Sequence, residues 1–279
     1  MSQEKKKLNT DSNAYTIVYA AVMVVIVALL LALTSSALKK RQDDNIALDK
    51  KKQILRALNV NLDGQDAAAL YEQYVTAAQL VKIDGTVVSE DRDVAFGVDV
   101  AKENAKPETE RQLPIYFATI DGQQKYVLPL RGAGLWGPIW GYVALNDDKQ
   151  TIFGVDFSHE SETPGLGGEI TKEFFTTRFK GKTLYASGEN AVEVVKSNAN
   201  DQQVDAISGA TFTSNGVRDM FNSSLKQYVI FLGGISEGST VEANDTADST
   251  EGAIDSEATQ VMPCCNAATA EIAEEASND

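Results

Sequence analysis

The residues from Ala14 to Leu38 form an uninterrupted stretch without a charged side chain, and this stretch constrains the fold more than any other feature. A helix rises about 1.5 Å per residue, so about twenty apolar residues cross the hydrocarbon layer of a bilayer. A helix is also the only structure in which a single segment satisfies its own backbone in lipid. Tyr15 and Tyr19 would lie at one interface and the basic residues 39–41 at the other. The sequence therefore predicts one transmembrane helix over residues 14–38, after a short N-terminal tail of residues 1–13.

The membrane segment leaves two questions with competing answers. The small residues Ser35–Ala37 are also typical of a signal-peptide cleavage site, but the apolar run is longer than a usual signal-peptide core, which favours a retained anchor. For orientation, Lys5–Lys7 precede the run, whereas Lys39–Arg41 and Lys50–Lys52 follow it. The positive-inside rule, counted this way, keeps the large domain in the cytoplasm, although large domains are translocated largely regardless of charge.

Acidic residues are concentrated at the C-terminus. The formal net charge is −15, and every charged residue from Glu237 to Asp279 is acidic. A segment of Ser, Thr, Ala and acidic residues buries too little apolar surface to offset its ordering entropy, so we expect residues 235–279 to be a disordered tail. Without this tail the chain is only mildly acidic, and we expect no nucleic-acid partner.

Cysteine and histidine give little support for catalysis or metal binding. Cys264 and Cys265 are adjacent within the tail and lack metal-ligand spacing. We expect two unengaged thiols there, with a vicinal disulfide or a lipid attachment as alternatives. His159 is the only histidine, which is weak evidence for a metal site or a Ser-His-Asp triad, and no G-x-S-x-G motif occurs. We therefore expect neither a catalytic residue nor a metal site in this chain.

Residues 39–92 are expected to form a helical connector. A helix over Asn45–Leu58 leaves the membrane, and a second one follows the candidate cap Asp66, with apolar positions that continue to Ala78. The alternation of apolar residues between Val94 and Val100 predicts a strand. This strand would open a domain that covers residues 93–234.

Successive hairpins make up most of that domain. Strands over Ile115–Ile120 and Gln124–Leu128 flank Asp121-Gly122, a strong turn dipeptide. Two more strands are expected over Gly141–Leu145 and Ile152–Phe157, then a short helix over 172–179 and a strand over 192–195. This order predicts an α+β fold with a largely antiparallel sheet that is flanked by helices.

Two glycine-rich segments interrupt the strands. Residues 129–142 combine four glycines with Trp136 and Trp140, which is consistent either with a site for a planar ring or with a tight connection that uses tryptophan to fill the core. The segment Glu162-Thr163-Pro164-Gly165-Leu166-Gly167 predicts a rigid loop with exposed N–H groups and one apolar side chain.

The segment Asp205-Ala206-Ile207-Ser208-Gly209-Ala210-Thr211 leads into an apolar pattern with a helical period that runs from Val217 to Leu232. Small residues and four hydroxyls, those of Ser208, Thr211, Thr213 and Ser214, thus lie at a helix N-terminus, where unpaired N–H groups favour a phosphate. The alternative is an ordinary Ser/Thr cap.

This segment resembles the flavinylation signature of the FMN-binding domain that occurs in the C subunit of the sodium-translocating NADH:quinone reductase and in the G subunit of the related Rnf complex. The resemblance implies that Thr211 carries FMN through a phosphoester bond. It also implies that Asp205, Ser208, Gly209 and Ala210 belong to the attachment segment, with Asp205 either recognised by a separate flavin transferase or orienting the Thr211 hydroxyl. The other flavin contacts that it implies are Trp136, Glu162, Thr163, Gly165 and Leu166.

By the same resemblance, the protein is expected to be a single-pass flavoprotein of the bacterial inner membrane with a periplasmic domain. It would relay electrons from NADH oxidation toward ubiquinone within a sodium-pumping oxidoreductase, together with other membrane and peripheral subunits. Asn13, Tyr15 and residues 50–55 resemble the sodium-pumping complex more than the Rnf complex. The G subunit of an Rnf-type electron-transport complex and a noncatalytic membrane-tethered scaffold are the alternatives.

Overall fold

A computed structural model describes residues 12–185, 190–200 and 202–233. Most of the expected N-terminal tail, the whole acidic segment 235–279 and its Cys264-Cys265 pair lie outside the described residues.

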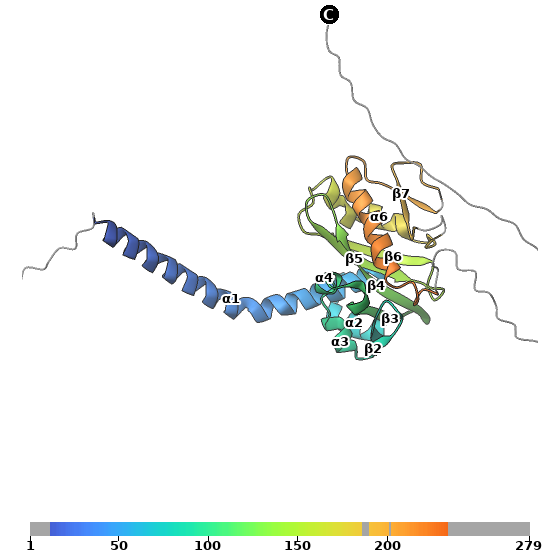
Figure 1. Ribbon diagram of the computed structural model, residues 1–279. Helices are drawn as coiled ribbons and strands as arrows, with labels where there is room; N and C mark the ends of the chain where they lie inside the picture. Colours follow the sequence, from blue (N-terminus) through green and yellow to red (C-terminus); the bar gives the residue numbers. More distant parts are fainter. Residues whose placement is uncertain (1–11, 186–189, 201, 234–279) are drawn as a thin grey trace, which may run out of the picture. The chain divides into compact units, whose positions relative to one another are not determined.

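The N-terminal half of the structure begins with one continuous helix, α1 (Asn13–Ala57), which starts at the N-cap Ser12. Its apolar part is long enough to cross a membrane and is not buried in the protein, as expected for a single anchor. The last turns of α1, in contrast, pack against the sheet, where Ile54, Leu55 and Ala57 are fully buried (Figure 1). The helix that was expected over Asn45–Leu58 is therefore the continuation of the membrane helix.

A six-stranded antiparallel sheet forms the centre of the domain, in the order β2-β1-β3-β4-β5-β6. The hairpin between β3 and β4 is confirmed, with Asp121 and Gly122 at positive φ angles of 49° and 75°, as a type I′ turn requires. The strands are β1 (Val75–Val81), β2 (Val87–Ser89), β3 (Leu113–Ile120), β4 (Gln123–Ala133), β5 (Pro138–Leu145) and β6 (Ile152–His159).

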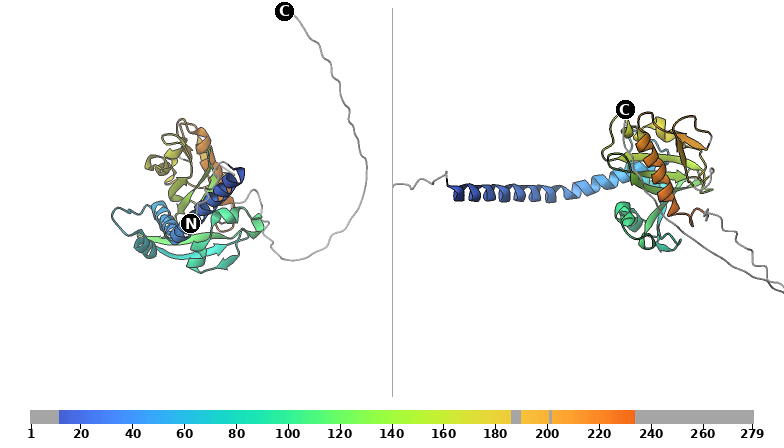
Figure 2. Two further views of the ribbon diagram at one scale, coloured as in Figure 1. Left: turned by 90° about the vertical axis from the view of Figure 1, so that its left-hand side faces the viewer. Right: turned by 45° about the horizontal axis from the view of Figure 1, so that its top comes forward.

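Helices cover both faces of this sheet (Figures 1 and 2). On one face α6 (Thr211–Lys226) packs on β4 through Val217, Met220 and Phe221, which are buried in the larger apolar cluster. On the other face the end of α1 and α2 (Ala67–Tyr74) pack on residues such as Val127. Side chains that alternate along each strand thus supply two separate cores, one for each face.

Short elements connect the sheet to α6. After β6 the chain forms a 3₁₀ turn, a single helical turn and a second 3₁₀ turn, which confirms the short helical segment expected near residues 172–179. A small parallel pair of strands then leads to α6, and its second strand had no sequence signal that we recognised. These elements are η2 (Gly167–Thr171), α5 (Glu173–Thr176), η3 (Thr177–Phe179), β7 (Glu193–Val195) and β8 (Gln203–Asp205).

Two expectations about the connector were wrong. The helix α2 ends at Tyr74, and the residues that follow form β1, since their backbone pairs with β3. The strand expected at residues 94–100 is instead two short helices, α3 (Arg92–Gly97) and α4 (Val100–Asn104), followed by the 3₁₀ turn η1 (Glu108–Glu110). The carboxylates of Asp91 and Asp99 cap these helices. This capping stabilises the helical conformation more than the alternation of apolar residues favours a strand.

Candidate functional site

The attachment segment ends in a helix N-terminus that no side chain caps. Thr211 is the first residue of α6, and the N-cap position is occupied by Ala210, which has no side-chain acceptor. The first backbone hydrogen bond into the helix runs from Ser214 N to Ala210 O at 2.9 Å. Within the described residues, the N–H groups of Thr211, Phe212 and Thr213 therefore have no acceptor. Such a terminus carries a partial positive charge and suits an anion.

The four hydroxyls of the segment divide into two pairs. Thr213 Oγ1 donates a hydrogen bond of 2.7 Å to Glu162 Oε2, and Ser214 Oγ accepts one of 3.0 Å from Ile207 N. Both side chains are buried. Ser208 and Thr211, in contrast, are exposed and reach solvent. An ordinary Ser/Thr cap does not describe this arrangement, because none of the four hydroxyls accepts from the first turn of α6 in the described structure.

Glu162 connects its own loop to the other glycine-rich segment and to the start of α6. Its side chain is only 4% exposed, and Oε1 accepts a hydrogen bond of 2.9 Å from Trp136 N. Since Oε2 accepts from Thr213, one carboxylate ties the β4–β5 turn to the first turn of α6. Gly134 and Gly167 leave space for it, because a Cβ atom at either position would clash with the carboxylate. Both oxygens of Glu162 are thus used inside the protein, so this side chain positions the site.

The loop after Glu162 is closed by its own backbone. Thr163 O accepts hydrogen bonds from Leu166 N at 3.1 Å and from Gly168 N at 2.9 Å. Gly165 adopts a φ of 78°, which favours glycine, and its N–H donates to Glu169 Oε1 at 3.1 Å. These bonds hold the Leu166 side chain outward. The side chain lies close to the attachment segment, because a Cβ atom at Gly209 would be only 3.0 Å from Leu166 Cδ2.

His159 has a structural role in the same loop. Its Nδ1 accepts a hydrogen bond of 3.2 Å from Glu162 N, and its Nε2 would lie 3.2 Å from a Cβ at Gly168. The imidazole therefore fixes the start of the loop that carries Leu166.

Large apolar side chains are exposed around the attachment segment. Trp136 is 66% exposed and Phe212 is 73% exposed, and Leu135 and Leu166 are also exposed. Trp136 therefore does not fill the core, which removes the second interpretation of the glycine-rich turn. Leu135 and Phe212 were not singled out from the sequence, although the position of Phe212 next to Thr211 could have drawn attention to it.

Asp205 makes its hydrogen bonds in the described structure to residues other than Thr211. Its Oδ1 accepts a hydrogen bond of 2.8 Å from Ala199 N, and its carbonyl accepts one of 2.7 Å from Arg178 Nη1. Arg178 also donates to Ala206 O at 3.3 Å. Among the described residues no hydrogen bond joins Asp205 to Thr211. Asp205 and Arg178 instead shape the approach to α6, and no sequence signal had indicated Arg178.

Comparison with known proteins places this geometry in a family. The model of the FMN-binding domain matches residues 134–226, which include every residue of the site. The C subunit of the Na⁺-translocating NADH-quinone reductase of Pseudomonas aeruginosa is 31% identical over 241 residues, which cover 77% of this chain and 92% of that protein. The chain belongs to the NqrC family, the C subunits of the Na⁺-translocating NADH-quinone reductases.

Solved structures of the NqrC family have the same fold. The crystal structure of the C subunit from Parabacteroides distasonis is 46% identical and superposes with a TM-score of 0.64 over 70% of this chain and 97% of that chain. NqrC of Shewanella oneidensis is 29% identical, with a TM-score of 0.57 over 66% of this chain and 94% of that chain. The resemblance stated from the sequence is confirmed.

The site fits the nucleotide for which the domain family is named. Three unpaired N–H groups at the start of α6 suit a phosphate, and the exposed Thr211 hydroxyl lies beside them. The exposed side chains of Trp136, Leu166 and Phe212 suit the faces and edge of a planar ring. When bound, FMN supplies reversible electron uptake, which no side chain of the site provides.

Proposed function

We propose that this protein carries FMN covalently on Thr211 Oγ1 and passes electrons through it within a sodium-pumping NADH:quinone reductase. The observation that carries the proposal is the exposed Thr211 hydroxyl at an uncapped helix N-terminus. The rest of the attachment segment supports it, because Gly209 has a φ of 79° and, like Ala210, presents no bulky side chain.

The attachment reaction defines what must be supplied from outside this chain. The Thr211 oxygen forms a bond to the flavin phosphorus and loses its proton, while the phosphorus loses a leaving group. A phosphate monoester is a poor donor for this step, so the donor is a flavin nucleotide whose phosphate is part of a pyrophosphate. A separate flavin transferase would deliver it. The phosphodiester keeps one negative charge, which the N–H groups of α6 stabilise.

A covalent link changes how the cofactor is held. Tethering replaces a binding equilibrium by a high local concentration, so the ring needs few contacts and can stay close to the surface. Leu166, held by the loop of residues 162–168, would cover the ring on one side, and Trp136 would lie on the other. Gly165 and Thr163 contribute backbone groups to the same loop. An exposed ring suits transfer to another protein of the complex.

For localisation, we propose a single-pass protein of the bacterial inner membrane with its large domain in the periplasm. The one long apolar helix of the described residues supports a single anchor in contact with membrane lipid. The count of basic residues on the two sides favours the opposite orientation, but large domains follow that rule poorly. The NADH and sodium steps require other membrane and peripheral subunits.

The test is covalent flavin on the full-length protein. We expect co-expression with a flavin transferase to give an ultraviolet-fluorescent band on a denaturing gel and a mass increase of one FMN less one water. Thr211→Ala abolishes both signals, whereas Ser223→Ala, which removes an exposed hydroxyl further along α6, retains both. Fluorescence that persists in Thr211→Ala would exclude Thr211, and an unmodified native chain would favour the scaffold alternative. The Rnf alternative is disfavoured because the named relatives belong to the sodium-translocating enzyme.

A further inference from the structure

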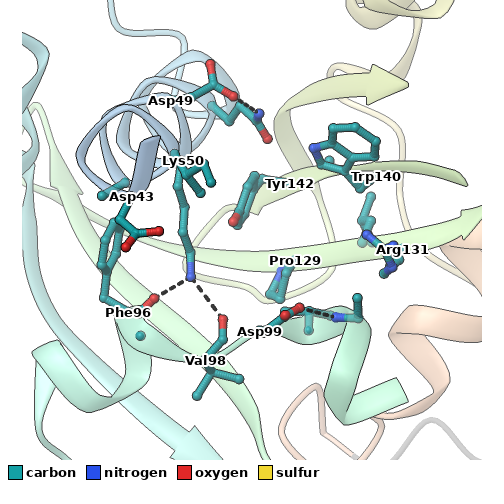
Figure 3. Close-up of a pocket in the computed structure, with 18 of the residues that line it drawn as sticks. Asp43, Asp49, Lys50, Phe96, Val98, Asp99, Pro129, Arg131, Trp140 and Tyr142 are labelled. Carbon is teal, nitrogen blue, oxygen red and sulfur yellow. Dashed lines mark hydrogen bonds between the residues drawn. The ribbon is translucent and has the colours of Figure 1, made fainter. Parts of the chain in front are cut away.

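A second candidate site lies on the face of the sheet opposite α6. A groove of about 880 Å³ runs between α1, the connection from α3 to α4, and strands β4 and β5 (Figure 3). Its walls come from residues 43–53, 96–101, 129–131 and 140–142. Gly132 on β4 faces Met220 of α6, so its neighbour Arg131 projects from the other face, into the groove. The groove is therefore separate from the flavin site.

Three hydrogen-bond donors in this groove lack an acceptor. Tyr142 is only 6% exposed, and its hydroxyl has no hydrogen-bond partner in the described part of the chain. The indole N–H of Trp140 and the guanidinium of Arg131 are likewise without a partner there. Arg131 and Trp140 are half-buried, and the three donors converge on the groove, so an occupant that offers oxygen acceptors, including a carboxylate for Arg131, would pair with all of them.

The remaining charges of the groove are mostly in use. Lys50 Nζ donates to the carbonyls of Phe96 at 2.5 Å and Val98 at 3.2 Å (Figure 3). Asp99 Oδ1 accepts from Ala101 N at 3.0 Å. Asp43 has no partner among the described residues and lies across the groove from Arg131 in Figure 3. An occupant with both signs of charge fits this pattern better than an anionic lipid head group, which the carboxylates would repel.

The groove begins close to the membrane. Asp43 follows Leu38, the last residue of the apolar run, by five positions, which places it about 8 Å further along the helix. Ile46, on the same part of α1, is 67% exposed. We propose that this groove binds an extended segment of another membrane-embedded subunit of the same complex, with apolar side chains against Trp140 and Tyr142 and a carboxylate on Arg131. Membership in the NqrC family makes the protein one subunit of a multisubunit complex, and the groove lies next to the apolar part of α1, where a membrane-embedded partner would be close.

Photocrosslinking in the purified, membrane-extracted complex tests the proposal. p-Benzoylphenylalanine in place of Trp140 should crosslink to a segment of another subunit next to one of its membrane spans, as identified by mass spectrometry. The control position is Val87 on β2, which is exposed and outside the groove. Crosslinks only to lipid or to residues 234–279 of the same chain, or a yield no higher than at Val87, would overturn the proposal.

A charge reversal provides a second readout. Arg131→Glu should reduce the fraction of this protein that stays with the complex after dilution by about tenfold, as expected for loss of a buried charge-assisted contact. Lys226→Glu, an exposed reversal on α6, should have no effect. The fold should persist in Arg131→Glu, because the backbone N–H of residue 131, which donates to Ser224 Oγ at 3.1 Å, is retained. Covalent flavin and thermal unfolding should match the unmodified protein. An unchanged retention would contradict the inference.

Discussion

The carboxylate of Glu162 accepts a hydrogen bond of 2.7 Å from the hydroxyl of Thr213, although the two residues are 51 positions apart. This buried contact joins the loop that presents Leu166 to the first turn of α6, two residues after Thr211. Through Trp136 N the same carboxylate also holds the β4–β5 turn. The arrangement of the attachment site therefore depends on one acidic side chain that does not itself reach the surface.

Replacing Thr213 by Val should destabilise the protein by about 1–3 kcal/mol, because the substitution removes the donor and leaves a buried carboxylate oxygen unsatisfied. Chemical denaturation of the full-length protein in detergent measures this loss. Thr211→Val removes an exposed hydroxyl and should change the free energy of unfolding by less than about 0.5 kcal/mol. Equal effects of the two substitutions would show that the Glu162–Thr213 contact contributes nothing.

Replacing Gly209 by Ala should lower both stability and the rate of flavin attachment. Its φ of 79° costs a non-glycine residue about 1–2 kcal/mol, and the new Cβ would lie 3.0 Å from Leu166 Cδ2. Gly122 is a matched control, since it has a φ of 75° with no atom within 4 Å of its Cβ position. We expect Gly122→Ala to lose similar stability but to be flavinylated at the normal rate. In-gel fluorescence over time distinguishes the two, and equally slow labelling would refute a local role.

The ion pair between Arg56 and Asp156 should anchor the end of α1 to β6. Arg56 Nε lies 2.8 Å from Asp156 Oδ1, and the Arg56 side chain is 44% exposed. Arg56→Met should cost about 1–3 kcal/mol at neutral pH, since it leaves a buried carboxylate without its partner. Lys102→Met, which removes an exposed pairing with Asp99, is the control and should be nearly neutral.

The cost of Arg56→Met should decrease in acid. Burial raises the pKa of Asp156 above its ordinary value, and Arg56 opposes this shift. Without Arg56 the pKa of Asp156 in the folded protein rises further above its value in the unfolded chain. Folding of the variant therefore takes up protons as the pH falls through the folded-state pKa. In that pH range the variant recovers stability relative to the unmodified protein. Thermal unfolding of both proteins across the acidic range checks this. A deficit that is independent of pH would mean that Asp156 does not titrate in this way.

The lowered pKa of Lys50 predicts a second pH dependence of stability, in the alkaline range. Burial lowers its pKa from 10.5 to about 8. Between these two values the unfolded chain binds a proton that the native protein has lost, so the free energy of unfolding should rise with pH from about 8 toward 10.5. Lys50→Met should lack this increment, and the stability difference between the two proteins should shift in favour of Lys50 as the pH rises. A constant difference across that range would contradict the lowered pKa.

Local sequence patterns were sufficient to predict several elements of the structure. The uncharged run up to Leu38, the Asp121-Gly122 turn and the start of a helix at Thr211 were all predicted, because each depends on residues adjacent in the chain. A bilayer imposes length and composition, a two-residue turn imposes positive φ angles, and a helix imposes its own period. These signals, with the resemblance they carried, identified the family.

Only the tertiary structure decided how the segments meet. Residues 75–81 pair with β3 as a strand because a partner strand is available, and residues 94–100 form helices because Asp91 and Asp99 cap them. The two oxygens of Glu162 bind Trp136 N and Thr213 Oγ1, and no local pattern around Glu162 indicated these partners. The physical reason is the same in each case: burial and hydrogen-bond partners come from residues far apart in the chain, and no local pattern records them.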